Sequence, residues 1–191
     1  MKNNLDQDKR LSKHVPLVFE CYSKEQIKDI NTKIHDNFLT EEQDPSDAAQ
    51  HANKTGKFYA LPIQPVAELL HQWFWNCQRT NQGVFGFDIY WNFHLEMINY
   101  NIYGVGDEYG WHTDANRFEA SDMKLTCLLN LSEEPYEGGE FHMMGQADDS
   151  AVTFEPGMGM VFHSPIAHKV TPVTQGERIT LTYWGIGPAW K

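Results

Sequence analysis

Residues 85–103 have the sequence FGFDIYWNFHLEMINYNIY, in which the apolar side chains follow the two-residue period of a β-strand. They occupy alternate positions from Phe85 to Met97, and the alternation shifts phase at Ile98, which predicts a strand with a turn or bulge near residues 92–98. Beyond this stretch, about seven or eight strands are expected, separated by Gly-rich turns and without a helical pattern. This region therefore predicts an all-β unit, either a sandwich or a barrel.

The preceding region shows helical spacing instead. Ser23 and Gln26 have the spacing of a capping box, and apolar residues recur behind them every three or four positions, as in an amphipathic helix. A second helix is expected over residues 65–79, and a short edge strand over residues 15–21. Helices before an all-β region predict a mainly β fold that is supported by helices on one face.

The length and composition of the chain fit a single domain. The chain has 191 residues, of which 41% are hydrophobic and 13% aromatic, enough for one sizeable core. We expect residues 1–191 to form one domain, with residues 1–84 as a helical N-terminal support. Residues 85–191 are expected to form the β-rich core that carries the active site.

Charge limits the expected partners. The chain has 15 Lys and Arg against 26 Asp and Glu, a formal net charge of −11, and no run rich in Lys or Arg. Neither nucleic acid nor an anionic membrane surface is therefore an expected partner. No stretch approaches 18 apolar residues, and the N-terminal residues do not resemble a signal peptide, so we expect no membrane span and a cytoplasmic location.

Cysteine usage agrees with a reducing compartment. Cys21, Cys77 and Cys127 lie far apart and form no CxxC pair. Buried thiols are therefore expected, rather than a disulfide framework or a Cys-rich zinc site.

Two histidines and one carboxylate stand at positions that suit a metal site. His112 and Asp114 are two residues apart at an expected strand end, so both side chains lie on the same face. Taken alone, such a pair is more often a surface histidine and a turn aspartate. His168 follows in the same β-rich region, and two imidazoles with one carboxylate can occupy one face of an octahedral Fe(II) centre. The three residues together predict a mononuclear metal site with open positions.

A cation follows the second histidine of this set. Arg178 opens the apolar segment RITLTYW (178–184) and shares one face of it with Thr180 and Thr182. Burying an arginine in such a strand is costly unless it meets an anion, and its planar fork suits a carboxylate. An ion pair with an acidic side chain of the chain itself is the simpler interpretation of an isolated arginine. The spacing from His168 favours a carboxylate ligand instead.

Four segments of the chain, in the right order, resemble the iron(II)- and 2-oxoglutarate-dependent dioxygenases. They are YGVGDEYGWHTD (103–114), LTCLLNLSEEPYEGGEF (125–141), FEPGMGMVFHSPIAHKVTPVTQGER (154–178) and ITLTYW (179–184). Within this superfamily the chain resembles the prolyl 4-hydroxylase-like group and its bacterial PKHD-type hydroxylases. The resemblance implies a double-stranded β-helix, a jelly-roll or cupin-like barrel of two facing sheets, with N-terminal α-helices packed on one sheet.

The resemblance also implies roles for individual residues. Arg178 would bind the distal carboxylate of 2-oxoglutarate, Tyr103 would support the same carboxylate, and Thr180 or Thr182 would add a hydroxyl. The residues that would bind Fe(II) are His112, Asp114 and His168.

Other residues near these motifs are expected to shape the site without binding the metal. Leu125, Phe162 and Trp184 would keep the pocket dry. His163 lies five residues before His168 but matches no position of the motif. The polar segments 40–57 and 115–122 are candidates for covering the substrate, with ordinary surface connections as the alternative.

The implied reaction is the hydroxylation of an unactivated C–H bond by O2, with release of succinate and CO2 from 2-oxoglutarate and with ascorbate as a candidate reductant. A prolyl residue in a protein or peptide is the expected substrate. The alternatives are another side chain, such as lysyl or asparaginyl, a free amino acid, or another small molecule. A non-catalytic cupin-like binding module is the alternative outside catalysis, although cupin metal sites usually have an HxH pair where this chain has HTD.

Overall fold

The computed structural model of the chain describes residues 15–39, 53–91, 97–115, 122–145 and 151–189. Within these residues the strands pair antiparallel in three sheets. In order across it, the six-stranded sheet consists of β1 (Leu17–Glu20), β8 (Met158–His163), β5 (Met123–Asn130), β11 (Arg178–Ile186), β3 (Met97–Tyr103) and β2 (Lys57–Pro62). The smaller sheets consist of β4 (Tyr109–His112), β9 (His168–Val170) and β7 (Phe141–Met143), and of β10 (Val173–Gln175) and β6 (Glu137–Gly138).

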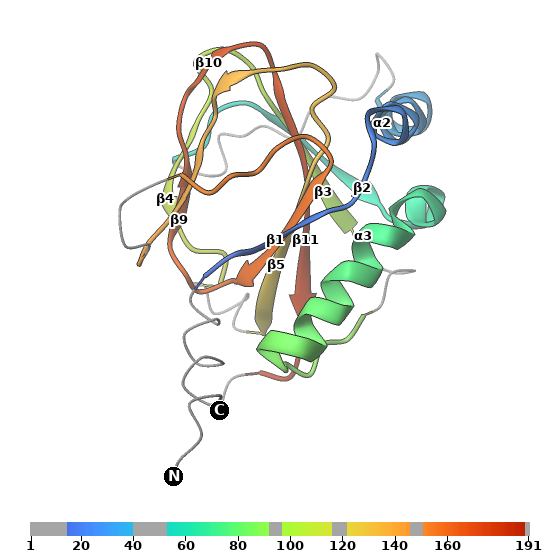
Figure 1. Cartoon of the computed structure of the whole chain (residues 1–191), viewed down its shortest axis with the longest axis vertical. Coiled ribbons are helices and arrows are strands. Elements are labelled where there is room, and N and C mark those ends of the chain that lie inside the picture. The colour runs from blue at the N-terminus through green and yellow to red at the C-terminus, as the bar shows by residue number, and fades with distance from the viewer. Residues whose placement is uncertain (1–14, 40–52, 92–96, 116–121, 146–150, 190–191) are drawn as a thin grey trace.

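The molecule is layered. Figure 1 shows the helices α2 (Lys24–Phe38) and α3 (Ala67–Thr80) on one side of the six-stranded sheet, with β4 and β9 on the other side. A 3-10 turn, Gln64–Val66, precedes α3, and a short π-helix, Asn81–Phe85, follows it. The site described below lies between the two sheets, on the face that the helices leave free.

Both helices were predicted correctly from their spacing. The Ser23 side chain accepts a hydrogen bond from the backbone N–H of Gln26, and the Gln26 side chain accepts one from the N–H of Ser23. Ile27, Ile30 and Ile34 of α2 are buried against the sheet side of the helix. The expected edge strand is also confirmed, because β1 lies at one edge of the six-stranded sheet.

Two apolar clusters fill the two sides of the six-stranded sheet. The larger one lies between the sheet and the helices, and the smaller one lies between the two sheets. The alternation of β5 divides its residues between them: Cys127 and Leu129 belong to the helix side, and Leu128 to the inter-sheet side. Leu125 also lies on the helix side, so the expectation that it keeps the pocket dry is wrong, because it points away from the pocket.

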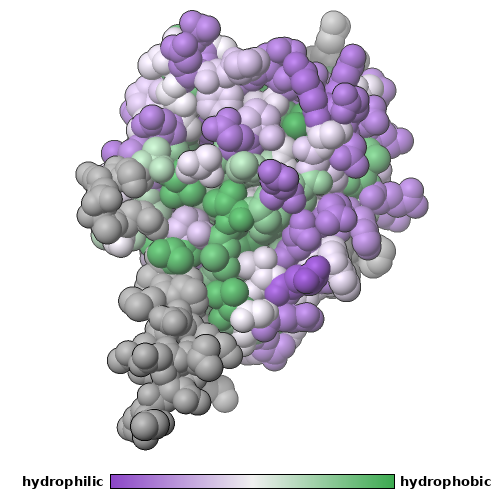
Figure 2. All heavy atoms as spheres, viewed as in Figure 1, coloured by the Kyte–Doolittle hydropathy of each residue, from purple (hydrophilic) through white to green (hydrophobic). Residues whose placement is uncertain are grey.

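The edge of the large sheet leaves some apolar surface exposed. Figure 2 shows apolar side chains gathered near the centre of the face seen in Figure 1, around β1. Val18 of this strand is 37% exposed.

The helices of the described residues include none that is both long and apolar enough to cross a bilayer.

The predicted strand over residues 85–97 is wrong where the structure describes it. The π-helix ends at Gly86, which has a left-handed φ of 66°, and residues 86–91 belong to no strand. The Asn81 side chain bonds both the N–H and the C=O of Phe87, which holds the chain in a turn. The alternation there reports which side chains are buried, because Phe85 and Ile89 enter the core without a partner strand. The predicted bulge near 92–98 falls mostly on residues outside the described ones.

The strand count also differs from the prediction. The described residues after position 85 form nine strands, four of which have only two or three residues and are too short for a clear pattern. In addition, β2 lies within the part expected to be a helical support, and it pairs with β3 along its whole length. Its segment, KFYALP, is short and ends in proline, so its sequence carries little strand signal.

Candidate active site

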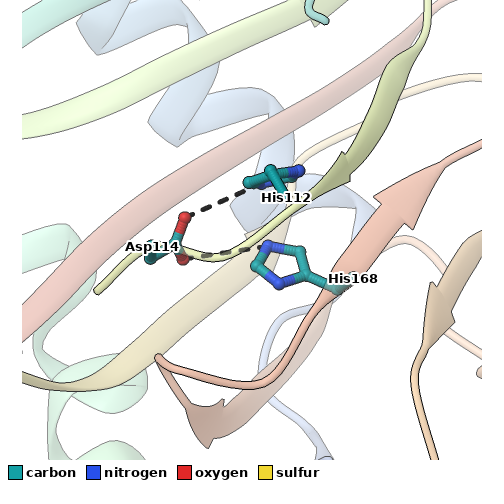
Figure 3. A group of neighbouring side chains, drawn as sticks. All are labelled: His112, Asp114 and His168. Atoms are coloured by element: carbon teal, nitrogen blue, oxygen red, sulfur yellow. Dashed lines mark ion pairs between the residues drawn. The ribbon is translucent and has the colours of Figure 1, made fainter. Parts of the chain in front are cut away.

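Three side chains converge where β4 and β9 pair. His112 ends β4, His168 begins β9, and the two residues lie opposite each other in the ladder. Asp114 follows two residues after His112. Its Oδ1 lies 3.7 Å from Nε2 of His112, and its Oδ2 lies 3.8 Å from Nε2 of His168 (Figure 3). The ligand atoms of the three residues all lie within 4.8 Å of one another, close enough to share one metal ion.

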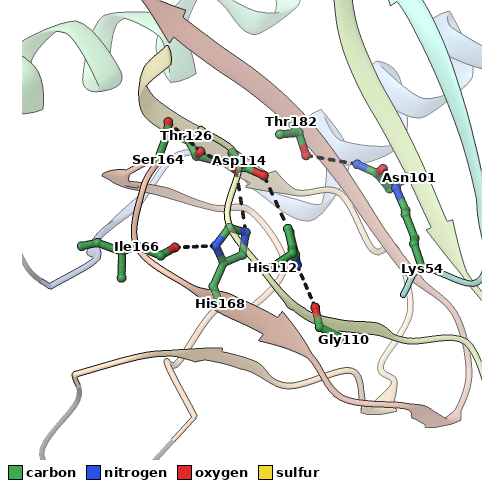
Figure 4. Close-up of polar contacts among 10 residues, drawn as sticks. All are labelled: Lys54, Asn101, Gly110, His112, Asp114, Thr126, Ser164, Ile166, His168 and Thr182. Carbon is green, nitrogen blue, oxygen red and sulfur yellow. Dashed lines mark hydrogen bonds and ion pairs between the residues drawn. The ribbon is translucent and has the colours of Figure 1, made fainter. Parts of the chain in front are cut away.

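Backbone carbonyls orient both imidazole rings. Nδ1 of His112 lies 2.8 Å from the carbonyl oxygen of Gly110, and Nδ1 of His168 lies 2.9 Å from that of Ile166 (Figure 4). Because a carbonyl oxygen only accepts, each Nδ1 carries a proton, and Nε2 is the ring nitrogen left to bind a metal. Burial, together with the neighbouring His168, lowers the pKa of His112 to about 4, so this ring is neutral near pH 7, as a metal ligand must be.

The aspartate is held by two hydroxyl groups that sequence reasoning missed. Oγ1 of Thr126 donates to Oδ2 of Asp114 over 2.5 Å and lies 3.0 Å from Oγ of Ser164 (Figure 4). The backbone N–H of Asp114 donates to the carbonyl of Ser164 over 3.1 Å. Residues that orient a ligand tune a metal site almost as much as the ligands do. Thr126 could have been found from its strand parity, since it alternates with the apolar Leu125 and Cys127.

Aromatic side chains pack around the two imidazoles. The ring of Tyr109 stacks on His112 with centroids 3.5 Å apart, and those of Phe141 and Phe162 lie 5.4 Å and 4.7 Å from His168. Phe162 thus packs on His168 from the inter-sheet cluster but does not line the cavity itself, so its expected role in keeping the pocket dry stays a prediction. His163 points to the other side of β8 and stacks on Phe87, so it is not among the converging ligands.

The three residues open into a cavity of about 510 Å³ between the sheets. The other predicted site residues line the same cavity: Tyr103, Arg178, Thr180, Thr182 and Trp184. Arg178 is 2% exposed and lies opposite Tyr103 in the β11–β3 ladder, with its guanidinium carbon 5.5 Å from the tyrosine ring. The structure therefore brings a buried cation and three metal-binding side chains to one cavity.

Arg178 has no counter-ion within the described part of the chain. No carboxylate there lies within 4.0 Å of its guanidinium, and its buried Nε has no hydrogen-bond partner there. A buried guanidinium without an anion is unfavourable, so this side chain fits an anionic ligand. Two imidazoles and a carboxylate likewise fit Fe(II), and the site as a whole fits a metal with a chelating dicarboxylate.

A second buried cation lines the cavity and was not found from the sequence. Lys54 lies in a polar segment, and an isolated bridge to Tyr109 brings it to the site. Its Nζ donates to Oδ1 of Asn101 over 2.7 Å, and burial lowers its pKa to about 8. The position of Lys54 in the cavity wall depends on contacts with distant segments, namely the bridge to Tyr109 and the hydrogen bond to Asn101.

The part of the chain that matches a known family contains the three converging side chains and Arg178. Residues 98–185 match the sequence model of the 2OG-Fe(II) oxygenase superfamily. This part of the chain is therefore similar in sequence to that superfamily. It is 36% identical over 93 residues to a PKHD-type hydroxylase of Alteromonas mediterranea and to one of Shewanella frigidimarina, covering 44% of this chain and 41% of each relative. The aligned part therefore spans less than half the length of these relatives.

Solved structures share the architecture over most of the chain. A prolyl-4-hydroxylase of Pseudomonas putida superposes with a TM-score of 0.71 at 20% identity, covering 94% of this chain and 96% of that one. A 2OG-Fe(II) oxygenase family oxidoreductase of Burkholderia pseudomallei gives 0.65 at 15% identity, with 99% and 93% covered. A prolyl hydroxylase of Trichoplax adhaerens, in complex with a peptide fragment of the hypoxia inducible factor oxygen degradation domain, gives 0.66 at 14%, with 97% and 93% covered.

These likenesses identify the fold. It is the predicted double-stranded β-helix, mainly β with helices packed on one sheet. The antiparallel sheets face each other without closing into a continuous barrel.

Proposed function

We propose that this chain is an Fe(II)- and 2-oxoglutarate-dependent hydroxylase. In this proposal His112, Asp114 and His168 bind the iron and Arg178 binds the distal carboxylate of 2-oxoglutarate. The observation that carries it is the shared cavity, in which a buried guanidinium without a counter-ion faces the same space as three converging metal-binding side chains. The match of residues 98–185 to the superfamily model supports the same chemistry.

Each residue of the site has a distinct task in this reaction. When bound, the iron supplies the oxidation of 2-oxoglutarate by O2 to succinate and CO2, coupled to hydroxylation of a C–H bond. The carbonyl-bonded imidazoles and the Thr126-bonded carboxylate keep their donor atoms aimed at one point. Arg178 binds the far end of the co-substrate, with Tyr103 and Thr180 beside it on the cavity wall. Leu128 and Trp184 line the same wall and exclude water.

The proposed substrate is a prolyl residue in a peptide or protein. The prolyl hydroxylases among the similar structures support this choice, one of them with a bound peptide. The cavity wall also includes Tyr109, Trp111 and Trp184, and flat aromatic surfaces suit the pyrrolidine ring. A free amino acid or another small molecule is the alternative substrate, and ascorbate is proposed only as an accessory reductant.

An anaerobic titration with Fe(II) and 2-oxoglutarate tests the proposal without a substrate. We expect a weak visible charge-transfer band from the metal-chelated keto acid in the wild-type protein and its loss in His168→Ala. The matched control is His142→Ala, because His142 lies on the neighbouring strand β7 in register with Lys169 and bonds Glu140 instead of the converging ligands. The control variant should keep the band.

Two results would contradict the proposal. If iron binds stoichiometrically but no band forms with 2-oxoglutarate, the site is a metal-binding module of the cupin-like kind. If the band survives in His168→Ala, the ligand set is misassigned. When the band behaves as expected, release of succinate in the presence of proline-containing peptides tests the prolyl substrate.

A further inference from the structure

Lys54 is a buried cation that the reaction proposed above does not use. The residue is 9% exposed, and its Nζ lies 4.8 Å, 5.4 Å and 5.7 Å from the ring centroids of Phe58, Tyr109 and Tyr103. Among the described residues, its one hydrogen bond goes to Oδ1 of Asn101. An ammonium group has three N–H donors, so this arrangement leaves donors available to a ligand in the cavity.

The orientation of Lys54 is fixed by its partner. Nδ2 of Asn101 donates to Oγ1 of Thr182 over 3.1 Å (Figure 4). It also donates to the carbonyl of Thr180 over 3.3 Å, and together these bonds turn Oδ1 of the amide toward the lysine. The lysine is therefore held by a chain of hydrogen bonds that ends on β11. Such preorganisation is typical of a side chain that binds a ligand, because the cost of ordering it has already been met.

No acidic residue of the described chain neutralises this lysine. No carboxylate there lies within 4.0 Å of Nζ, and Asp114, the carboxylate that acts on it over a longer range, is the proposed iron ligand. Aromatic faces and one amide oxygen stabilise an ammonium group less than a carboxylate does. A purely structural lysine at this depth would be expected to have a counter-ion.

The charge balance of a cavity that holds Fe(II) and 2-oxoglutarate indicates where an anionic partner for Lys54 would come from. The charged side chains among the described residues that line the cavity are Lys54, Arg178 and Asp114. In the proposed loaded site the two charges of Fe(II) and the two of 2-oxoglutarate would cancel, and so would those of Asp114 and Arg178. The charge of Lys54 would be left over, because one carboxylate of the co-substrate would pair with the metal and the other with Arg178.

The position of Lys54 favours the substrate as the source of the anion that pairs with it. Its neighbour Asn53 is exposed and lines the same cavity, whereas Arg178 is 2% exposed. Lys54 is thus itself buried but is next in the chain to an exposed residue of the cavity wall. We propose that Lys54 binds a carboxylate of the substrate and so selects acidic substrates. This inference rests on the proposed function, since it presumes that iron and 2-oxoglutarate fill the rest of the cavity.

The test compares acids with their neutral amides. Anaerobic calorimetry with saturating Fe(II) and 2-oxoglutarate would use N-acetylglycine and N-acetyl-L-proline, each against its amide, to probe a main-chain carboxylate. Acetyl-Glu-Pro-Ala-amide against acetyl-Gln-Pro-Ala-amide probes an acidic side chain instead. We expect the wild-type protein to bind one of the acids about tenfold or more tightly than its amide. The pair that shows the preference identifies the source of the carboxylate.

Variants of Lys54 connect the preference to this side chain. Lys54→Met should bind acid and amide within about twofold of each other, and Lys54→Arg should retain part of the preference. The matched control is Lys57→Met, because Lys57 is exposed on β2 and absent from the cavity lining. The control should keep the full preference.

The same samples separate the two proposals, because the charge-transfer band reports 2-oxoglutarate binding independently of the probes. No preference for any acid in the wild-type protein, or a preference that survives in Lys54→Met, overturns the role of Lys54. Loss of the band in Lys54→Met would also overturn it, since Lys54 would then belong to the co-substrate site. A wild-type protein without the band contradicts the proposed function itself.

Discussion

The two faces of strands β5 and β11 differ in chemistry, although their residues alternate along the same segments. The face toward the helices is apolar, and it includes five residues that are 0% exposed: Leu125, Cys127, Leu129, Leu181 and Tyr183. The face toward the cavity is mainly polar, and includes Thr126, Arg178, Thr180 and Thr182. One face stabilises the fold and the other positions ligands, so substitutions one residue apart should have separable effects.

Burying the polar face costs free energy, and most of its polar groups have specific hydrogen-bond partners. Thr126 bonds Asp114, and Thr182 accepts from Asn101. Arg178 and Trp184 are exceptions among the described residues, since Nε of Arg178 and Nε1 of Trp184 have no hydrogen-bond partner there. Polar groups that a fold leaves unsatisfied occur at functional sites more often than in structural cores, because a ligand completes them.

The strongest test of the comparison is Asp114→Ala, at the cavity. Removing the carboxylate should abolish iron binding and lower turnover of 2-oxoglutarate by about a hundredfold or more, because the variant loses the anionic ligand of the site. The urea midpoint of the metal-free protein should stay close to that of the wild type. Anaerobic iron binding and urea unfolding measure the two effects, and an Asp114→Ala protein with normal turnover would show that the ligands are wrongly assigned.

Leu181→Ala tests the opposite face of β11. Leu181 is fully buried against the helices, so truncating it should lower the free energy of unfolding by about 2–5 kcal/mol. The folded variant should still bind iron with wild-type stoichiometry. Urea unfolding followed by circular dichroism measures the loss, and a large change in iron affinity with unchanged stability would mean that the two faces are not independent.

Arg178→Met returns to the cavity and keeps much of the side-chain volume. The KM for 2-oxoglutarate should rise by roughly tenfold or more, because a charge-assisted hydrogen bond to the co-substrate is lost, while iron affinity should change by less than about twofold. The KM of Arg178→Lys for 2-oxoglutarate should lie between those of the wild type and of Arg178→Met. If iron is lost and the KM is unchanged, Arg178 has a structural role.

The smallest expected effect is that of Thr126→Val, which removes one hydroxyl from the cavity face. Iron affinity should fall by about tenfold, since Asp114 loses the donor that orients its Oδ2. Thr174→Val on β10 is the control, because that side chain is exposed and does not line the cavity. Equal affinities for Thr126→Val and the wild type would show that Thr126 does not support the metal.

Sequence patterns predicted local structure better than pairing. The capping box at Ser23 predicted the start of α2 because its signal lies within four residues. The alternation over residues 85–91 predicted a strand that does not form, because period-two burial does not require a hydrogen-bonded neighbour, and Asn81 turns the chain there instead. Pairing depends on distant segments, and a single sequence carries little information about these.

The residues of the candidate site likewise separate into those that local spacing predicted and those that depend on contacts between distant segments. The motif residues His112, Asp114, His168 and Arg178 were found by spacing, and the structure brings them to one cavity. Thr126, Ser164 and Lys54 were missed because their roles arise from contacts across strands. For Lys54 no signal exists within its own segment, whose neighbours are all polar.

Each imidazole takes its orientation from the carbonyl two residues before it, at Gly110 and at Ile166. These acceptors belong to the backbone, so no substitution of either side chain deletes them unless it changes the path of the chain. Each ligand and its acceptor thus form a three-residue unit. Substitutions in the surrounding loops should therefore leave the geometry at the two histidines in place as long as the path of the backbone is kept.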